Sequence, residues 1–457
     1  MKIIILGAGQ VGSSLAKNLQ KDHNISVVDE RAERLRHIQN HFDVKTICGS
    51  ASHPNILEEA GANDADMIIV VTNNDEVNIV ACQIAYSLFK IPTKIARLRN
   101  KNYARHPQIF NNDNIPIDLI INPSELVTQR LVRLVEHPGS FQIVDFANGR
   151  LQLAGSEIAE DSPLHGMSIR EFRQELPDID ARVVAIYRKK QNLLISVDTV
   201  LQKEDEVFFI AERINIPAIL REFQPQQTVC RKLFIAGGGN IGMGLAKKLE
   251  NDYLVKIVER NYENCHLAAE TLKNTTVLSG DASDAELLNA ESIGDTDLFC
   301  AVTNDDEANI MSAMLAKKMG AKSTIALVNS LSYAALVDET HTIDRAISPQ
   351  RITIGVIQTY LRKGDMLNIY SLYGGHAEAC EIVVHGTADS SPIVGKKISE
   401  LNLPKAIIIG AIVRDDTVLV AHDHYTIESG DHVIVTITDL DHVYTIEKLF
   451  QVLPVFL

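Results

Sequence analysis

Two short glycine-rich segments carry residue types that bind a pyrophosphate. Each follows an apolar run, at 3–6 and 233–236, and precedes a helix-like pattern. In such a loop the first glycine makes the tight turn, the second lets backbone approach the phosphates and the third lets helix pack on strand. The helix N-terminus then offers free amides. We expect dinucleotide contacts from Gly7, Gly9, Gln10, Val11 and Gly12 in the first copy, and from Gly237, Gly239, Asn240, Ile241 and Gly242 in the second.

An acidic residue follows each glycine loop at the distance that ribose recognition requires. Asp29 and Glu259 stand about 20 residues beyond the loops, where a carboxylate accepts hydrogen bonds from ribose hydroxyls. It would repel a 2′-phosphate, so the sequence favours NAD or adenosine nucleotides over NADP. The alternative, a solvated acid at a strand end, would have to occur twice. Glycines and acids alike recur after 230 positions, as Gly7 and Gly237 show, which indicates a tandem duplication.

Polar residues also follow the other predicted strands. Thr72 and Asn73 match Thr303 and Asn304, and we expect them to line the nucleotide crevice, because ligands of open α/β sheets sit beyond the carboxyl ends of the strands. Asn73 and Asn304 each precede a glutamate by three residues, however, and this is equally the spacing of a helix capping box.

The third strand of each copy ends in a short turn that is placed to contact an adenine edge. The residues concerned are Ser50 and Ala51 in the first copy and Asp281 and Ala282 in the second; an ordinary turn is the alternative.

Two arginines distinguish the copies. Arg97 and Arg99 end the fifth predicted strand of the first copy, where the second copy has Leu327 and Asn329. A guanidinium offers a planar fork to phosphate oxygens, so the first site is predicted to hold more anionic charge. Exposed arginines in surface ion pairs are the alternative interpretation.

The elements that must position these residues alternate between strand-like and helix-like patterns. The alternation predicts an α/β fold with two Rossmann-like, doubly wound parallel-sheet lobes. Each is followed by a helix that begins at a proline, at 123–136 and at 349 to about 362, and then by a small α+β lobe. We therefore expect domains at 1–136, 137–224, 230–362 and 366–457.

The two proline-initiated helices are apolar on more than one side and so must be covered on more than one side. One interpretation is a buried core helix; the other is a crossover helix packed between two lobes or two subunits. The second implies that lobes pair face to face.

Composition narrows the function classes. A net charge of −15 argues against nucleic acid, because binding to a phosphate backbone uses clustered Lys and Arg. The longest apolar run, 406–413, is far short of the roughly 20 residues that span a bilayer, so we expect no direct membrane insertion. A predicted strand begins at Lys2 and leaves no room for a signal peptide, which favours a cytosolic location. The six cysteines lack C-x-x-C spacing and are interpreted as reduced structural thiols.

Searches for catalytic signatures give no candidate. His37 with His41, and His422 with His424, have pair spacing but no convincing third ligand, so no metal site is expected. Neither a G-x-S-x-G nor a Walker A sequence occurs.

Longer strings give a specific resemblance over essentially the whole chain. They include 1–12, 61–62, 64–67, 81–83, 309–317 and 449–451. With these strings the chain resembles the TrkA family, the nucleotide-binding subunits of bacterial Trk potassium-uptake systems, built from tandem regulator-of-potassium-conductance (RCK) domains. Ser50, where the second copy has Asp281, departs from the duplicated pattern.

The resemblance implies a regulatory protein and not an enzyme. Its ligands would be NAD(H) and ATP/ADP. It would form a homo-oligomer, a tetrameric ring, on the cytoplasmic face of the cell membrane. Its partner would be a membrane-embedded potassium channel subunit of the TrkH/TrkG type, gated by a change in ring shape.

Two alternatives stay open. An NAD-dependent dehydrogenase would need a proton acceptor such as His or Lys against a substrate pocket, and the small lobes show no repeated constellation of that kind. A nucleotide-binding scaffold for another transporter is the third possibility.

Overall fold

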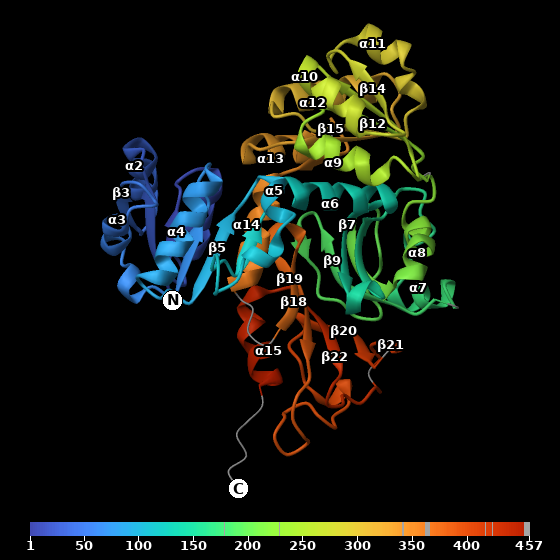
Figure 1. Ribbon diagram of the computed structural model, residues 1–457. Helices are drawn as coiled ribbons and strands as arrows, with labels where there is room; N and C mark the ends of the chain where they lie inside the picture. The colour runs from blue at the N-terminus through green and yellow to red at the C-terminus, as the bar shows by residue number, and fades with distance from the viewer. Residues whose placement is uncertain are drawn as a thin grey trace.

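The computed structural model describes residues 1–177, 179–227, 229–340, 342–361, 366–415, 417–422 and 424–451. Its order along the chain is large lobe, small lobe, large lobe, small lobe (Figure 1). The predicted fold class is confirmed: both large lobes are parallel-sheet α/β units, and both small lobes contain an antiparallel sheet with helices.

The first large lobe has a six-stranded parallel sheet in the order β3-β2-β1-β4-β5-β6. The order reverses beside β1, so the connections that leave β1 and β4 turn to opposite faces of the sheet, which is where open α/β sheets bind their ligands. Its elements are β1 Lys2–Leu6, α1 Gln10–Leu19, β2 Asn24–Asp29, α2 Ala32–His41, β3 Lys45–Cys48, α3 Pro54–Glu59, β4 Met67–Val70, α4 Asp75–Ser87, β5 Thr93–Arg97, α5 Lys101–Ala104 and β6 Leu119–Ile121.

The second large lobe repeats this topology as β14-β13-β12-β15-β16-β17. The predicted strands are present, and the structure adds β17 and the helix α13, which the sequence patterns did not indicate. Its elements are β12 Lys232–Ala236, α9 Asn240–Leu249, β13 Leu254–Glu259, α10 Tyr262–Thr271, β14 Thr276–Ser279, α11 Ala285–Ala290, β15 Leu298–Ala301, α12 Asp306–Lys318, β16 Ser323–Leu327, α13 Leu331–Thr340 and β17 Arg345–Ile347.

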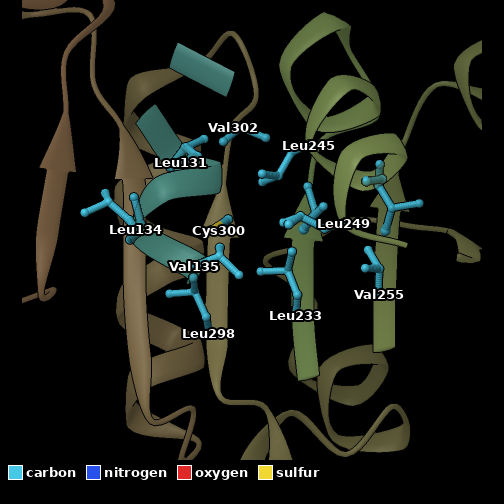
Figure 2. Packing of buried hydrophobic residues seen from close by; sticks show 14 of the residues in the cluster. Leu131, Leu134, Val135, Leu233, Leu245, Leu249, Val255, Leu298, Cys300 and Val302 are labelled. Atoms are coloured by element: carbon cyan, nitrogen blue, oxygen red, sulfur yellow. The ribbon is translucent and has the colours of Figure 1, made fainter. Parts of the chain in front are cut away.

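The proline-initiated helices α6 (Pro123–Glu136) and α14 (Pro349–Leu361) cross between the lobes. Val127, Leu131 and Val135 of α6 are buried in the core of the second large lobe, not the first. Figure 2 shows Leu131 and Val135 among the labelled side chains of that core. In exchange, Ile354 and Ile357 of α14 are buried in the core of the first large lobe. The crossover interpretation is therefore confirmed, and both lobes involved belong to one chain.

The small lobes pack sheet against sheet. Their orders are β10-β9-β11-β8-β7 and β18-β19-β22-β20-β21, all antiparallel. Phe146, Phe208 and Ile210 of the first sheet share one buried cluster with Val413 and Ile434 of the second. The elements are β7 Ser140–Phe146, β8 Leu151–Glu157, α7 Ile169–Glu175, β9 Ala181–Arg188, β10 Gln191–Asn192, β11 Glu206–Glu212, α8 Ile216–Phe223, β18 Met366–Leu372, β19 Ala377–Val383, β20 Ile407–Arg414, β21 Thr417–Val420, β22 His432–Ile437 and α15 Val443–Phe450.

Within the described ranges, no helix is both long and apolar enough to cross a membrane.

Candidate functional site

The three glycines of each loop have the conformations that close approach to a phosphate requires. Gly7 and Gly237 have φ values of 105° and 111°, a left-handed region that only glycine adopts at little cost. A Cβ at Gly12 would lie 1.8 Å from the carbonyl oxygen of Gly7, so helix and strand meet too closely for any side chain. Gly9, in contrast, faces open space, with no atom within 4 Å of an added Cβ. The same is true of Gly239.

Each loop ends at a helix that has no side-chain cap. Gly9 precedes α1, and Gly239 precedes α9, with no side-chain hydrogen bond to the first turn. The helices begin at Gln10 and Asn240, so the predicted residues of both motifs surround a helix N-terminus with positive partial charge. No atom within 4 Å of an added Cβ at Gly9 or Gly239 would obstruct an anion at these positions.

The two predicted ribose carboxylates lie beside their loops. Asp29 Oδ2 accepts a hydrogen bond from the Ala8 amide at 2.7 Å, and its Oδ1 accepts one from the Arg31 amide at 2.8 Å. Glu259 is held in the same way, by the amides of Gly238 at 2.6 Å and Asn261 at 2.7 Å. A carboxylate has about four acceptor positions. Both side chains are therefore oriented and still have acceptor capacity for a pair of hydroxyls.

A buried asparagine connects the ends of the next two strands. Asn78 is fully buried on α4; its amide group donates to the carbonyls of Thr72 (3.4 Å) and Arg97 (2.7 Å), and the Thr72 hydroxyl donates to its oxygen. Asn309 repeats this arrangement with Thr303, at 2.6 Å, and with the carbonyl of Leu327, at 2.9 Å. Neither asparagine was predicted as a site residue, although Asn78 and Asn309 occupy matching positions, six residues after Thr72 and Thr303.

The capping-box alternative placed the helix cap one residue too early. The N-cap of α4 is Asn74, which accepts from the amide of Val77 at 2.7 Å. In the second copy Asp305 caps α12 through the amide of Ala308, at 2.9 Å. Asn73 and Asn304 are consequently not caps; both are exposed at the strand ends. Their contact with a nucleotide stays a prediction.

The turns that follow the third strand of each copy, β3 and β14, differ in charge, because the first has Ser50 where the second has Asp281. Ser50 has its hydroxyl 3.4 Å from that of Ser52, whereas Asp281 accepts from the Ser283 amide at 2.9 Å. The hydroxyl of Ser283 and then its amide, both of which donate to Asp281, lower the pKa of that carboxyl, and Arg260 lies 3.7 Å from it. Next to them, Ala51 is buried and Ala282 is half-buried.

Arg97 and Arg99 lie at the carboxyl end of β5, on the same sheet edge as the first glycine loop. Arg97 is half-buried, and its Nε is buried without a hydrogen-bond partner. Burial, and then the charge of Arg99, lowers the pKa of Arg97 to about 10, so it is still cationic at neutral pH. Arg99 is exposed, with its backbone amide 2.8 Å from Asp75. The structure thus gathers the first-copy residues at one edge; their contacts with ligand stay predictions.

The geometry defines a class of protein with two dinucleotide-type sites, each in an α/β lobe that is followed by an antiparallel lobe. Family models for the TrkA-N domain match residues 3–123 and 233–349, and models for the TrkA-C domain match 153–224 and 387–451. The chain belongs to the TrkA family.

Relatives match over nearly the full length. The Trk system potassium uptake protein TrkA of Halomonas elongata is 48% identical over 99% of both chains. Proteins of the same name from Vibrio alginolyticus and Haemophilus influenzae are 46% identical over 100% of both chains and 44% identical over 99% of both.

Solved structures share the fold at low identity. The crystal structure of the GsuK RCK domain has a TM-score of 0.63 and 17% identity, and the alignment covers 98% of this chain and 94% of that one. A structure described as the GsuK channel bound to NAD has a TM-score of 0.62 and 17% identity over 98% of this chain and 78% of that one.

Proposed function

We propose that the protein is the nucleotide-binding regulatory subunit of a potassium-uptake system. Its relatives of 44–48% identity are named Trk system potassium uptake proteins, and their alignment leaves almost no part of this chain unmatched. Within that family the observation that carries the proposal is the pair of loops with open space over Gly9 and Gly239 and an oriented carboxylate beside each.

NAD(H) and ATP/ADP are the proposed ligands. A structure of the same fold is described as bound to NAD, and a carboxylate at Asp29 or Glu259 favours a ribose with a free 2′-hydroxyl. Arg97 gives the first site a partly desolvated cation with no hydrogen-bond partner at its Nε. We therefore assign a triphosphate or diphosphate nucleotide to the first site and an NAD-like ligand to the second.

The proposed partner is a membrane-embedded potassium channel subunit of the TrkH/TrkG type. A cytoplasmic homotetramer on the inner face of the membrane would gate it by changing shape with the bound nucleotide. A ligand shifts such an equilibrium only if it binds the two shapes unequally. A nucleotide can bind the two shapes unequally only if its site is in contact with the interfaces between lobes. The crossover helices provide this contact, because α6 packs against α9 and α14 packs against α1, and both α9 and α1 begin at a glycine loop.

The experiment combines binding with flux on the full chain. We expect Asp29→Ala or Glu259→Ala to weaken nucleotide binding at its own site by about 1–3 kcal/mol, because ribose hydroxyls then lack their acceptor. Calorimetry with NADH and ATP measures the affinities, and potassium flux through a co-reconstituted channel measures regulation. Unchanged nucleotide affinity in both variants would contradict the assigned sites. Potassium flux that is the same with and without nucleotide would contradict the regulatory role.

The role that we propose is regulatory and not enzymatic. Mixing the protein with NADH and candidate carbonyl substrates, and following NADH absorbance, tests the dehydrogenase alternative directly. Turnover would revive that alternative.

A further inference from the structure

The loop residue after the first glycine differs between the copies: Ala8 in the first and Gly238 in the second. Backbone conformation does not explain the glycine. Gly237 has a positive φ, but Gly238 does not, so an alanine would fit the backbone there as Ala8 fits it in the first copy. Some neighbour of Gly238 must account for the absent methyl group.

That neighbour is the ribose carboxylate. A Cβ at Gly238 would lie 3.1 Å from Cβ, Cγ and Oε2 of Glu259, closer than side chains normally pack. In the first copy the acid is Asp29, which is one methylene shorter and reaches the Ala8 amide at 2.7 Å. Both acids therefore end at the same amide, and the longer one has to fold across the position that the Ala8 methyl group occupies in the first copy.

We propose that residues 8 and 29, and likewise 238 and 259, are size-matched pairs that set the position of the ribose carboxylate. Alanine goes with aspartate, and glycine goes with glutamate. Gly238 is thus a positioning residue of the second nucleotide site, although it bears no side chain and is not one of the three fingerprint glycines. This inference rests on the proposed function for its ligand, and on geometry alone for the pairing.

The pairing predicts what a mismatched pair would do. With an alanine at 238, Glu259 has to move by a few tenths of an ångström, and its carboxylate, at the free end of the side chain, can move furthest. The carboxylate then leaves the 238 amide, which loses its 2.6 Å hydrogen bond, and the ribose loses an oriented acceptor. Shortening the acid to aspartate removes one methylene and recreates the residue pair of the first copy, in which an alanine and the hydrogen bond between carboxylate and amide occur together.

The test is a double-mutant cycle on the full chain, with binding at the first site weakened by Asp29→Ala. We expect Gly238→Ala to weaken NADH binding about tenfold, the consequence of roughly 1.4 kcal/mol of lost contact. Adding Glu259→Asp to that variant should recover most of the loss. In the reciprocal cycle, Glu259→Ala weakens binding at the second site. Asp29→Glu should then weaken nucleotide binding at the first site, and adding Ala8→Gly to Asp29→Glu should restore it.

A second readout uses the protein without nucleotide. Hydrogen exchange of the amide at position 238 should be slow in the wild type, faster in Gly238→Ala and slow again when Glu259→Asp is added. The pairing is wrong if Gly238→Ala leaves both affinity and exchange unchanged, or if Glu259→Asp fails to rescue. If the second site of the wild type binds no NADH, the proposed function fails there, and the exchange measurements still decide the pairing.

Discussion

Arg97 combines partial burial with an unused hydrogen-bond donor. Its Nε has no partner, and Arg99 adds a second positive charge close by. A partly desolvated cation interacts more strongly with an anion than an exposed one does, because water screens it less. These features favour the phosphate-binding interpretation of Arg97 over that of a surface ion pair.

At the residue scale we expect Arg97→Ala combined with Arg99→Ala to abolish ATP-dependent channel activation and leave NAD binding at the second site intact. Charge-assisted phosphate contacts contribute roughly 1.5–3 kcal/mol each, so discrimination between ATP and ADP should fall ten- to hundredfold. Calorimetry and flux measure both effects. Grafting the second-copy residues, as Arg97→Leu with Arg99→Asn, is the matched variant. If ATP still activates the channel to the same extent in either variant, the two arginines are not the residues that detect ATP.

The sequence predicted site residues only where their spacing follows a known rule. The glycines, Asp29 and Glu259 follow a known fingerprint and lie together at the sheet edge. Asn78 and Asn309 were not selected, because a buried asparagine that bridges two strand ends has no local spacing signal. Comparing the two copies does give a signal, since both asparagines recur within matching strings.

At the element scale, α14 contacts the nucleotide-binding helix of the other half of the chain. Gln350 is buried, and its Nε2 donates to the Gln10 carbonyl at 2.8 Å and to the Ser14 hydroxyl at 2.6 Å. Between α6 and α9, Glu125 and Lys248 form an exposed ion pair at 2.6 Å. The first site is therefore attached to its crossover helix at the first turn of α1.

We expect Gln350→Ala to lower the free energy of unfolding by about 1–2 kcal/mol and to weaken the coupling between nucleotide binding at the first site and flux. The loss arises because the Gln10 carbonyl and the Ser14 hydroxyl each lose a hydrogen bond from the Gln350 amide. Lys248→Ala is the matched control and should cost less than about 1 kcal/mol, as exposed ion pairs do. Urea denaturation measures stability. Equal effects of the two variants would show that Gln350 has no special role.

The sequence predicted elements well where a single periodicity decides them. The predicted bounds of α6 coincide with the observed ones, because a proline marks the start of the helix. It did not indicate α13, whose apolar residues follow no clear helical stripe, or β17, which is three residues long. Apolar faces on α6 and α14 showed that both are covered, but nothing local specifies which lobe covers which helix.

At the scale of the whole molecule, each half completes the core of the other. The buried side chains Val127, Leu131, Leu134 and Val135 of α6 together represent roughly 6–12 kcal/mol of transfer free energy. The apolar faces of these helices predicted that lobes pair face to face, and the lobes that pair in this way belong to one chain. These helices therefore give no support to the proposed tetramer.

This exchange predicts the behaviour of a separated half. We expect residues 1–224 expressed alone to dimerise, because α6 and the inner face of the small sheet would otherwise expose apolar surface that a second copy can cover. Light scattering at micromolar concentration measures the mass. Changing Leu131→Glu in the fragment should weaken the dimer, and a well-folded monomeric fragment without that change would contradict the prediction.

The exchanged helices also bear on how the chain is synthesised. When α6 leaves the ribosome, the strands that bury Leu131 and Val135 have not yet been translated. Translation proceeds at about 5–20 residues per second, so this apolar face of α6 stays uncovered for several seconds until the strands of the second large lobe have been translated. The first large lobe waits longer still, since α14 follows more than 200 residues after β6. Neither half can reach its final packing before almost the entire polypeptide has emerged, which makes the nascent chain a substrate for chaperones during that interval.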